Sequence, residues 1–159
     1  MMNLRWSFTL VALVVAALLF ALTESRSTTA HADSPAPTSQ LQPVEKDMHE
    51  FMEYVFQPTY KRLKPSMASE PADNNAWKGI KADALILAEG GNLLMIRKPK
   101  EDAAIWDELS AAVREAGGSM YQAAKKKDYM SARQHYEGML KKCNACHDKF
   151  AEGEHQLSP

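Results

Sequence analysis

The sequence predicts an all-α protein, an antiparallel up-down-up-down four-helix bundle, and three observations lead to this prediction. From residue 44 to residue 150 apolar residues recur at spacings of three and four, with no sustained alternation of period two. Aspartates stand where helices should begin, and prolines stand where two of them should end. The connections between the last three segments are short, which implies antiparallel neighbours.

The first 32 residues differ in kind from the rest. Arg5 supplies positive charge, a run of apolar residues follows from Phe8 to Leu22, and small residues at Ala30 and Ala32 fit a signal-peptidase site. We expect residues 1–32 to be a cleaved secretion signal. An uncleaved membrane anchor is the alternative, although the apolar run is short of the roughly 20 residues that a membrane span needs. Both interpretations imply export.

Three further parts follow the signal. Residues 33–43 are rich in Pro, Ser and Thr and are predicted to be a flexible leader. Residues 44–152 form one domain, and residues 153–159 form a C-terminal tail, expected to be frayed from residue 156 onward. A composition of 45% hydrophobic and 25% charged residues suits a globular domain, and a net charge of −1 does not favour a nucleic-acid partner.

The first predicted helix spans residues 44–63, with Pro58 kinking it or ending its first half near Phe56, and it ends before Pro65. The second spans residues 74–97, with Asp73 as N-cap and Pro99 as the stop. The expected apolar stripe of the first helix is Val44, Met48, Phe51, Met52, Val55 and Phe56.

The third predicted helix spans residues 102–126, and the fourth runs from its cap at Asp128 to residue 152. The inner face of the third helix is expected to comprise Ile105, Trp106, Leu109, Ala112, Val113, Ala116, Met120 and Ala124. The aromatic residues expected in the core are Tyr54, Trp77, Trp106, Tyr121 and Tyr136.

The fourth helix carries the only two cysteines, Cys143 and Cys146, with His147 directly after them. A redox dithiol would typically lie at a helix N-terminus that follows a strand, whereas this pair lies late in a helix. A zinc site needs four ligands, and the remaining histidines of the domain and tail stand in no recognised zinc spacing. A plain disulfide, which an oxidising compartment favours, is the third alternative.

Covalent haem attachment accounts for every member of the C-x-x-C-H motif. Cysteines three residues apart lie on one face of a helix, one turn from each other, which suits two thioether bonds to one edge of a porphyrin. His147, four residues after Cys143, stands on the same face and can bring an imidazole nitrogen to the iron.

Cys143, Cys146, His147 and the following Phe150, on the last helix of an exported helical domain, resemble the class II c-type cytochromes, the cytochrome c prime family. The resemblance covers residues 44–152 and implies one covalent haem c with its iron. Family members often have a basic residue directly after that Phe, where this chain has Ala151.

The predicted topology places the first helix opposite His147, and Met52 is our first choice for the sixth iron ligand. His49 and an open distal site are the alternatives. In the family that this chain resembles, the distal position is Met in six-coordinate low-spin members and apolar in five-coordinate, gas-binding members. The topology also places Gly90, Gly91 and Trp106 around the haem.

The sequence therefore predicts a periplasmic monohaem cytochrome that transfers single electrons between periplasmic redox proteins, with a His/Met-ligated low-spin haem, rather than an enzyme. A five-coordinate haem protein that binds nitric oxide or carbon monoxide, as sensor or scavenger, is the alternative. A homodimer stays open, and membrane contact is expected only if the signal is retained.

Overall fold

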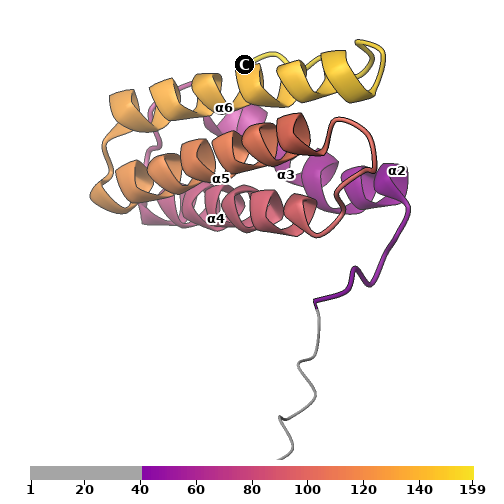
Figure 1. Ribbon diagram of the computed structural model, residues 1–159. Helices are drawn as coiled ribbons and strands as arrows, with labels where there is room; N and C mark the ends of the chain where they lie inside the picture. Colours follow the sequence, from indigo (N-terminus) through magenta and orange to yellow (C-terminus); the bar gives the residue numbers. More distant parts are fainter. Residues whose placement is uncertain (1–40) are drawn as a thin grey trace, which may run out of the picture. The chain divides into compact units, whose positions relative to one another are not determined.

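The structure, a computed structural model, describes residues 41–159, and all regular structure within this range is helical (Figure 1). No strand occurs in residues 41–159, so the all-α prediction is confirmed for them. The predicted signal at residues 1–32 and most of the leader lie outside the described residues. Within the described range, no helix is long and apolar enough to span a membrane.

The first helical segment begins at Met48 and is made of three consecutive pieces, α2 (Met48–Phe51), η1 (Met52–Phe56) and α3 (Gln57–Ser66). The Asp47 carboxylate caps it by accepting a hydrogen bond from the backbone N–H of Glu50 at 3.0 Å. The prediction that the helix starts at Val44 and stops before Pro65 is wrong at both ends. Pro65 lies in the last turn, where a missing N–H disturbs little helix beyond it.

The middle piece, η1, is a π-helical turn immediately before Pro58. Because Pro58 has no N–H, the carbonyl four residues before it loses its helical partner, and the neighbouring N–H of Gln57 bonds to the carbonyl of Met52, five residues back. The disturbance that Pro58 predicts near Phe56 therefore takes the form of a wider turn. Such turns change the direction in which the side chains of that turn point, and Met52 is the first residue of this one.

Helices α4 (Asn74–Met95), α5 (Ala103–Lys126) and α6 (Tyr129–Phe150) lie side by side, α5 against both others (Figure 1). Asp73 accepts a hydrogen bond from the N–H of Ala76 at 2.8 Å, and Asp128 accepts one from the N–H of Ser131 at 3.0 Å. Both predicted N-caps are confirmed. The connection from α5 to α6 turns at Lys127, which ends α5 in the left-handed conformation.

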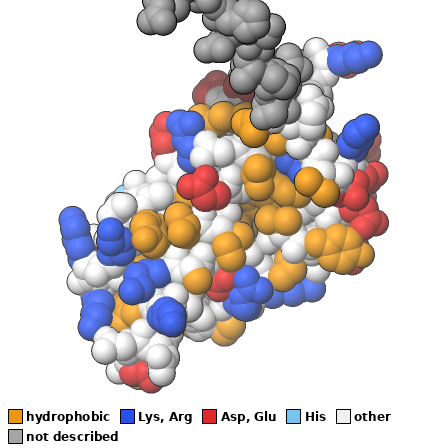
Figure 2. Space-filling model, turned by 90° about the horizontal axis from the view of Figure 1, so that it is seen from below, with side chains coloured by type: hydrophobic (Ala, Val, Ile, Leu, Met, Phe, Trp, Pro, Cys, Tyr) orange, Lys and Arg blue, Asp and Glu red, His pale blue; other side chains and the backbone are white. Residues whose placement is uncertain are grey.

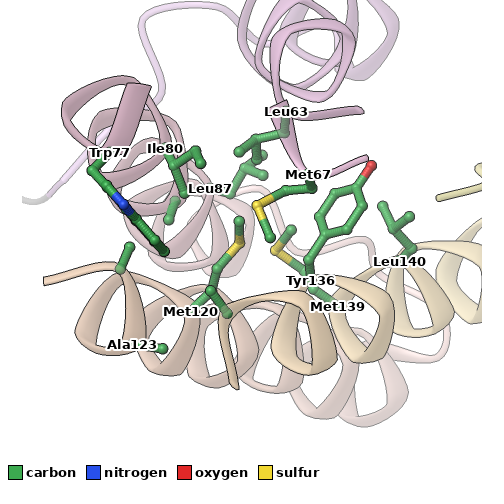
Figure 3. Packing of buried hydrophobic residues seen from close by; sticks show 13 residues of the cluster. Leu63, Met67, Trp77, Ile80, Leu87, Met120, Ala123, Tyr136, Met139 and Leu140 are labelled. Atoms are coloured by element: carbon green, nitrogen blue, oxygen red, sulfur yellow. The ribbon is translucent and has the colours of Figure 1, made fainter. Parts of the chain in front are cut away.

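The main core, which we call the Tyr136 cluster, brings side chains from α3, α4, α5 and α6 together (Figure 3). Tyr136 and Met139 of α6 are fully buried and face Met67, which follows α3. The burial of these side chains supplies most of the hydrophobic stabilisation of the fold. The buried members are Leu63, Met67, Trp77, Ile80, Ala84, Leu87, Met120, Ala123, Ala124, Ala132, Tyr136, Met139 and Leu140.

Helices α4 and α5 approach each other closely because glycines stand at their crossing. A Cβ added at Gly117 would lie 2.9 Å from the backbone nitrogen of Ala88, and one at Gly91 would lie 2.8 Å from that of Arg114. The cost of glycine in a helix is thus offset by close packing at these two positions. An added Cβ at Gly118 would meet nothing within 4 Å.

The seam, by which we mean the space between α6 and the first helical segment, is less closely packed than the α4–α5 crossing. The close backbone contacts of α6 in the described chain are with α5, and none joins it to α2, η1 or α3. Large side chains, including Tyr60 and Tyr136, fill one part of this seam. The remaining part holds the cavity described below.

Several predicted core residues are instead exposed. Tyr54 is 67% exposed, Ile105 is 40% exposed, and Val44 precedes the first helix with its side chain in solvent. The inner face of α5 is rotated toward Ser110 and Gly117, small residues that the apolar pattern did not include. Figure 2 shows hydrophobic side chains gathered on the face seen from below Figure 1, where α4 lies; the exposed apolar residues of α4 are Leu85, Ile86 and Leu93.

The C-terminal tail, residues 153–159, is bonded to the domain, so the expectation of a frayed end is wrong. Asn144 of α6 and Leu157 exchange two hydrogen bonds, from the Asn144 amide to the Leu157 carbonyl at 2.9 Å and from the Leu157 N–H to the Asn144 amide oxygen at 2.8 Å. The Tyr60 hydroxyl donates to the carbonyl of Ser158 at 2.8 Å. The tail therefore reaches across the seam from α6 to α3.

Candidate functional site

Cys143, Cys146 and His147, one turn of α6, line a single cavity of about 560 Å³. The structure thus brings together on one surface the three residues that the C-x-x-C-H motif predicts to act together. The two cysteines are not joined in a disulfide. A volume of this size lies within the range of small-molecule and cofactor sites, roughly 300 to 1,000 Å³.

The imidazole of His147 is oriented by the tail. Its Nδ1 atom lies 2.9 Å from the backbone carbonyl oxygen of His155. A carbonyl oxygen can only accept, so this contact assigns the proton to Nδ1 and leaves the lone pair of the neutral ring on Nε2. Histidines that bind metals generally make such a contact through the nitrogen that does not face the metal.

Burial lowers the pKa of His147, and the hydrogen bond to the His155 carbonyl opposes this effect. Burial is also the main influence on the two thiols. It raises the pKa of Cys143 to about 12, with a smaller contribution from Cys146, and it raises the pKa of Cys146 to about 11. The imidazole is thereby favoured in its neutral form and both sulfurs are favoured as thiols. Reactive dithiols shift in the opposite direction.

The opposite wall of the cavity is formed by the first helical segment, with Met48, His49 and Met52 among the lining residues. Met52 is half-buried and packs against an apolar cluster of Phe51, Leu94 and Trp106, which we call the Phe51 cluster. Cys146 packs against the same cluster. The thioether of Met52 and the C-x-x-C-H motif therefore share one apolar environment.

His49, the predicted alternative to Met52, lies at the margin of the cavity. Its side chain is 74% exposed, and its Nε2 atom is 3.6 Å from a carboxylate oxygen of Glu53, one turn later. Of the two predicted distal residues, Met52 is thus the one held by apolar packing.

Trp106 closes the cavity on the α5 side. It is buried, its indole N–H donates to the carbonyl of Leu94 at 2.8 Å, and its ring meets the ring of Phe150 edge-on with centroids 5.0 Å apart. The indole bond satisfies a carbonyl near the end of α4 while the ring face supplies apolar wall. Trp106, which is predicted to lie around the haem, is among the residues that line the cavity.

The glycines predicted around the haem, Gly90 and Gly91, are not among the residues that line the cavity. A Cβ at Gly90 would lie 2.7 Å from the ring of Phe56, whose side chain does line it. Gly91 faces Arg114 of α5. Gly90 therefore stands behind the cavity wall, where it makes room for Phe56, and Gly91 serves helix packing.

The sequence did not indicate that Leu157 and the carbonyl of His155 belong to this site. Leu157 lines the cavity and also packs against the Tyr136 cluster. A single apolar residue after a helix gives no periodic signal. A backbone carbonyl gives none at all.

The residues of the cavity fit a covalently attached haem in their chemistry. Two thiols and an imidazole with its Nε2 lone pair available lie on one wall, a thioether lies on another, and most of the remaining surface is apolar. Among residues 41–159, no three His, Cys, Asp or Glu side chains are grouped so as to hold a metal ion by themselves. Comparisons with protein-family models, with curated proteins and with solved structures found no match to this chain.

Proposed function

We propose that this protein is an exported monohaem c-type cytochrome that transfers single electrons between periplasmic redox proteins. The proposal includes antiparallel up-down-up-down packing of the helices, thioether bonds from Cys143 and Cys146, and iron ligation by His147 and Met52. The observation that carries it is that these four residues line one apolar cavity. The resemblance of the motif to class II c-type cytochromes supports it.

A bound haem would supply an iron centre that changes its charge by one electron. The residues of this chain would set the conditions for that change. The apolar walls contributed by Trp106, Leu94 and Phe56 exclude water and lower the local dielectric constant, which disfavours the more charged state of the iron. A methionine ligand at Met52 would raise the reduction potential relative to a second imidazole.

Electron transfer requires no acid, base or nucleophile, and the proposal assigns no catalytic residue. Export rests on the predicted signal at residues 1–32, which lies outside the described range. An exported chain would need no disulfide here, because the haem would consume both cysteines. The reaction partners in this proposal are periplasmic redox proteins.

The second candidate function is a five-coordinate haem protein that binds nitric oxide or carbon monoxide. The specific observation in its favour is the apolar character of the wall around Met52, where Phe56 and Leu94 lie. Without methionine ligation, this wall would form an apolar pocket beside the iron that suits a diatomic gas.

The experiment is an absorbance spectrum of the protein produced in a host that attaches haem to C-x-x-C-H motifs. Electron transfer through a His/Met haem predicts a low-spin spectrum and a far-red band from methionine-to-iron charge transfer in the oxidised form. A high-spin spectrum that responds to carbon monoxide would favour the gas-binding alternative. A protein without covalent haem would contradict both candidates and leave the disulfide, zinc and dithiol alternatives.

Matched variants of α6 sharpen this test. His147→Ala should leave the haem tethered but change its spectrum, whereas His135→Ala, on the same helix but away from the cavity, should not. An unchanged spectrum for His147→Ala would mean that another residue is the proximal ligand. Replacement of both cysteines by serine should abolish covalent attachment.

A further inference from the structure

The C-terminal tail makes polar contacts with both walls of the seam that the cavity occupies. On the α6 side, Asn144 and Leu157 exchange two hydrogen bonds, at 2.9 and 2.8 Å. On the α3 side, Tyr60 and Lys64 both bond to Ser158, the lysine ammonium donating to the serine hydroxyl at 2.7 Å. Since α6 and α3 make no close backbone contact in the described chain, this segment is a direct link between them.

The reversal that returns the tail to α6 uses three residues in the left-handed region. Glu152, Gly153 and His155 have φ values of 53°, 78° and 57°. Only the glycine adopts this conformation at little cost, so the two others must be held there by the surrounding contacts. Among those contacts, the N–H groups of Ala151 and Gly153 both donate to the carbonyl of His147, at 2.9 and 3.1 Å.

This reversal brings the carbonyl of His155 to the imidazole of His147 at 2.9 Å. The contact fixes the plane of the ring and the nitrogen that carries the proton. Leu157, two residues later, lines the cavity and packs against the Tyr136 cluster. One short segment therefore orients the imidazole and covers the cavity beside it.

We propose that residues 153–159 are a strap that positions His147 as the proximal ligand and closes the seam between α3 and α6. The role toward iron rests on the proposed haem function, whereas the closing role does not. Asn144 is a positioning residue in this proposal, because it acts on His147 only through the tail. A hydrogen bond from Nδ1 to a carbonyl makes an imidazole a stronger donor at Nε2, and this favours oxidised iron.

The first test measures hydrogen–deuterium exchange of the tail amides in the full-length chain, and it needs no haem. Asn144→Leu keeps the C-x-x-C-H motif and removes both bonds to Leu157. The hydrogen-bonded amides of the tail, those of Glu154, Leu157 and Ser158, should then exchange at least about tenfold faster. Asn144→Asp keeps the acceptor for the Leu157 N–H and should give an intermediate rate. Asn92→Leu, on α4, removes an amide that bonds only to Glu89 and should leave the tail unchanged.

Equal exchange of the tail in Asn144→Leu and in the wild type would overturn the strap. Faster exchange throughout α6 would show general loosening rather than release of the tail, and this would also contradict it. Circular dichroism checks that each variant keeps its helices.

The second test measures the reduction potential of the haem-loaded protein. Asn144→Leu should raise it, because the His155 carbonyl is then no longer held at Nδ1. Asn92→Leu should match the wild type. Unchanged potentials with a released tail would overturn the positioning role. A wild-type protein that takes up no haem would instead refute the proposed function, and the exchange result would stand independently.

Discussion

A Cβ atom placed on Gly117 of α5 would lie 2.9 Å from the backbone nitrogen of Ala88 on α4. Real Cβ contacts do not occur at this distance against a backbone, so one helix must move if the residue is enlarged. Gly118, the next residue, has nothing within 4 Å of the corresponding position. The two neighbouring glycines thus serve different purposes.

Gly117→Ala should lower the free energy of unfolding by about 1 to 3 kcal/mol, because the added methyl overpacks the α4–α5 crossing. Gly118→Ala is the matched control and should raise it by up to about 1 kcal/mol, since alanine favours a helix and meets no neighbour there. Urea unfolding of both variants gives the two values. Equal effects of the two substitutions would contradict the close crossing.

Asp83 of α4 is largely buried and binds the guanidinium of Arg62 on α3, with the shortest N–O distance at 2.6 Å. Asp83→Ala should lower the free energy of unfolding by about 1 to 2 kcal/mol. A fully buried ion pair would cost more, but Arg62 is half exposed and solvent screens its charge. Asp107→Ala removes the carboxylate from an exposed pair with Lys98 and should cost less than about 1 kcal/mol. Thermal unfolding that ranks the two variants in reverse order would contradict this assignment.

The hydroxyl of Tyr136 is buried and has no hydrogen-bond partner among the described residues. Tyr136→Phe should therefore raise the free energy of unfolding by about 1 kcal/mol at neutral pH, because an unsatisfied buried hydroxyl is removed. Tyr60→Phe should lower it by about 1 kcal/mol, because that hydroxyl bonds to Ser158. A loss of stability in Tyr136→Phe, measured by urea unfolding, would indicate a partner for its hydroxyl.

The same tyrosine predicts a pH dependence at alkaline pH. Burial raises the pKa of Tyr136 to about 12 from an ordinary value of 10.0. The unfolded chain therefore loses this proton first. Ionisation of Tyr136 leaves the free energy of unfolding unchanged below pH 10 and lowers it as the pH rises toward 12. The stability of Tyr136→Phe should fall less steeply across this window than that of the wild type. Parallel curves would contradict the raised pKa.

Met52→Leu should open a coordination site in the haem-loaded protein, because leucine keeps the apolar packing against the Phe51 cluster but cannot bind iron. The far-red band should disappear, the reduction potential should fall, and carbon monoxide should bind at least about tenfold more tightly. His49→Leu is the control and should change none of the three. A wild-type protein that lacks the far-red band, and in which His49→Leu rather than Met52→Leu raises the affinity for carbon monoxide, would make His49 the distal ligand.

The helices were predictable because their signals are local. Asp73 and Asp128 predict the starts of α4 and α6, and both cap the helices that follow. The C-x-x-C-H motif also predicted that its three residues lie together, since residues 143, 146 and 147 on any α-helix share a face. The same periodicity brings all three to the cavity.

The features that escaped prediction depend on contacts between distant segments. Ser110 and Gly117 face the core because α5 is rotated to bring small residues against α4, so Ile105 is left outside. The order of the tail arises from partners as far away as Tyr60, and its reversal places Glu152 in a conformation that its residue type does not indicate. These positions are determined by packing between distant segments, which the local sequence pattern does not indicate.

Thioether bonds from Cys143 and Cys146 to one haem are tested most directly by the intact mass of the denatured protein from a host that matures c-type cytochromes. We expect a mass equal to the polypeptide plus one haem, and replacement of both cysteines by serine should return it to that of the polypeptide. A wild-type mass equal to the polypeptide alone would contradict covalent haem attachment.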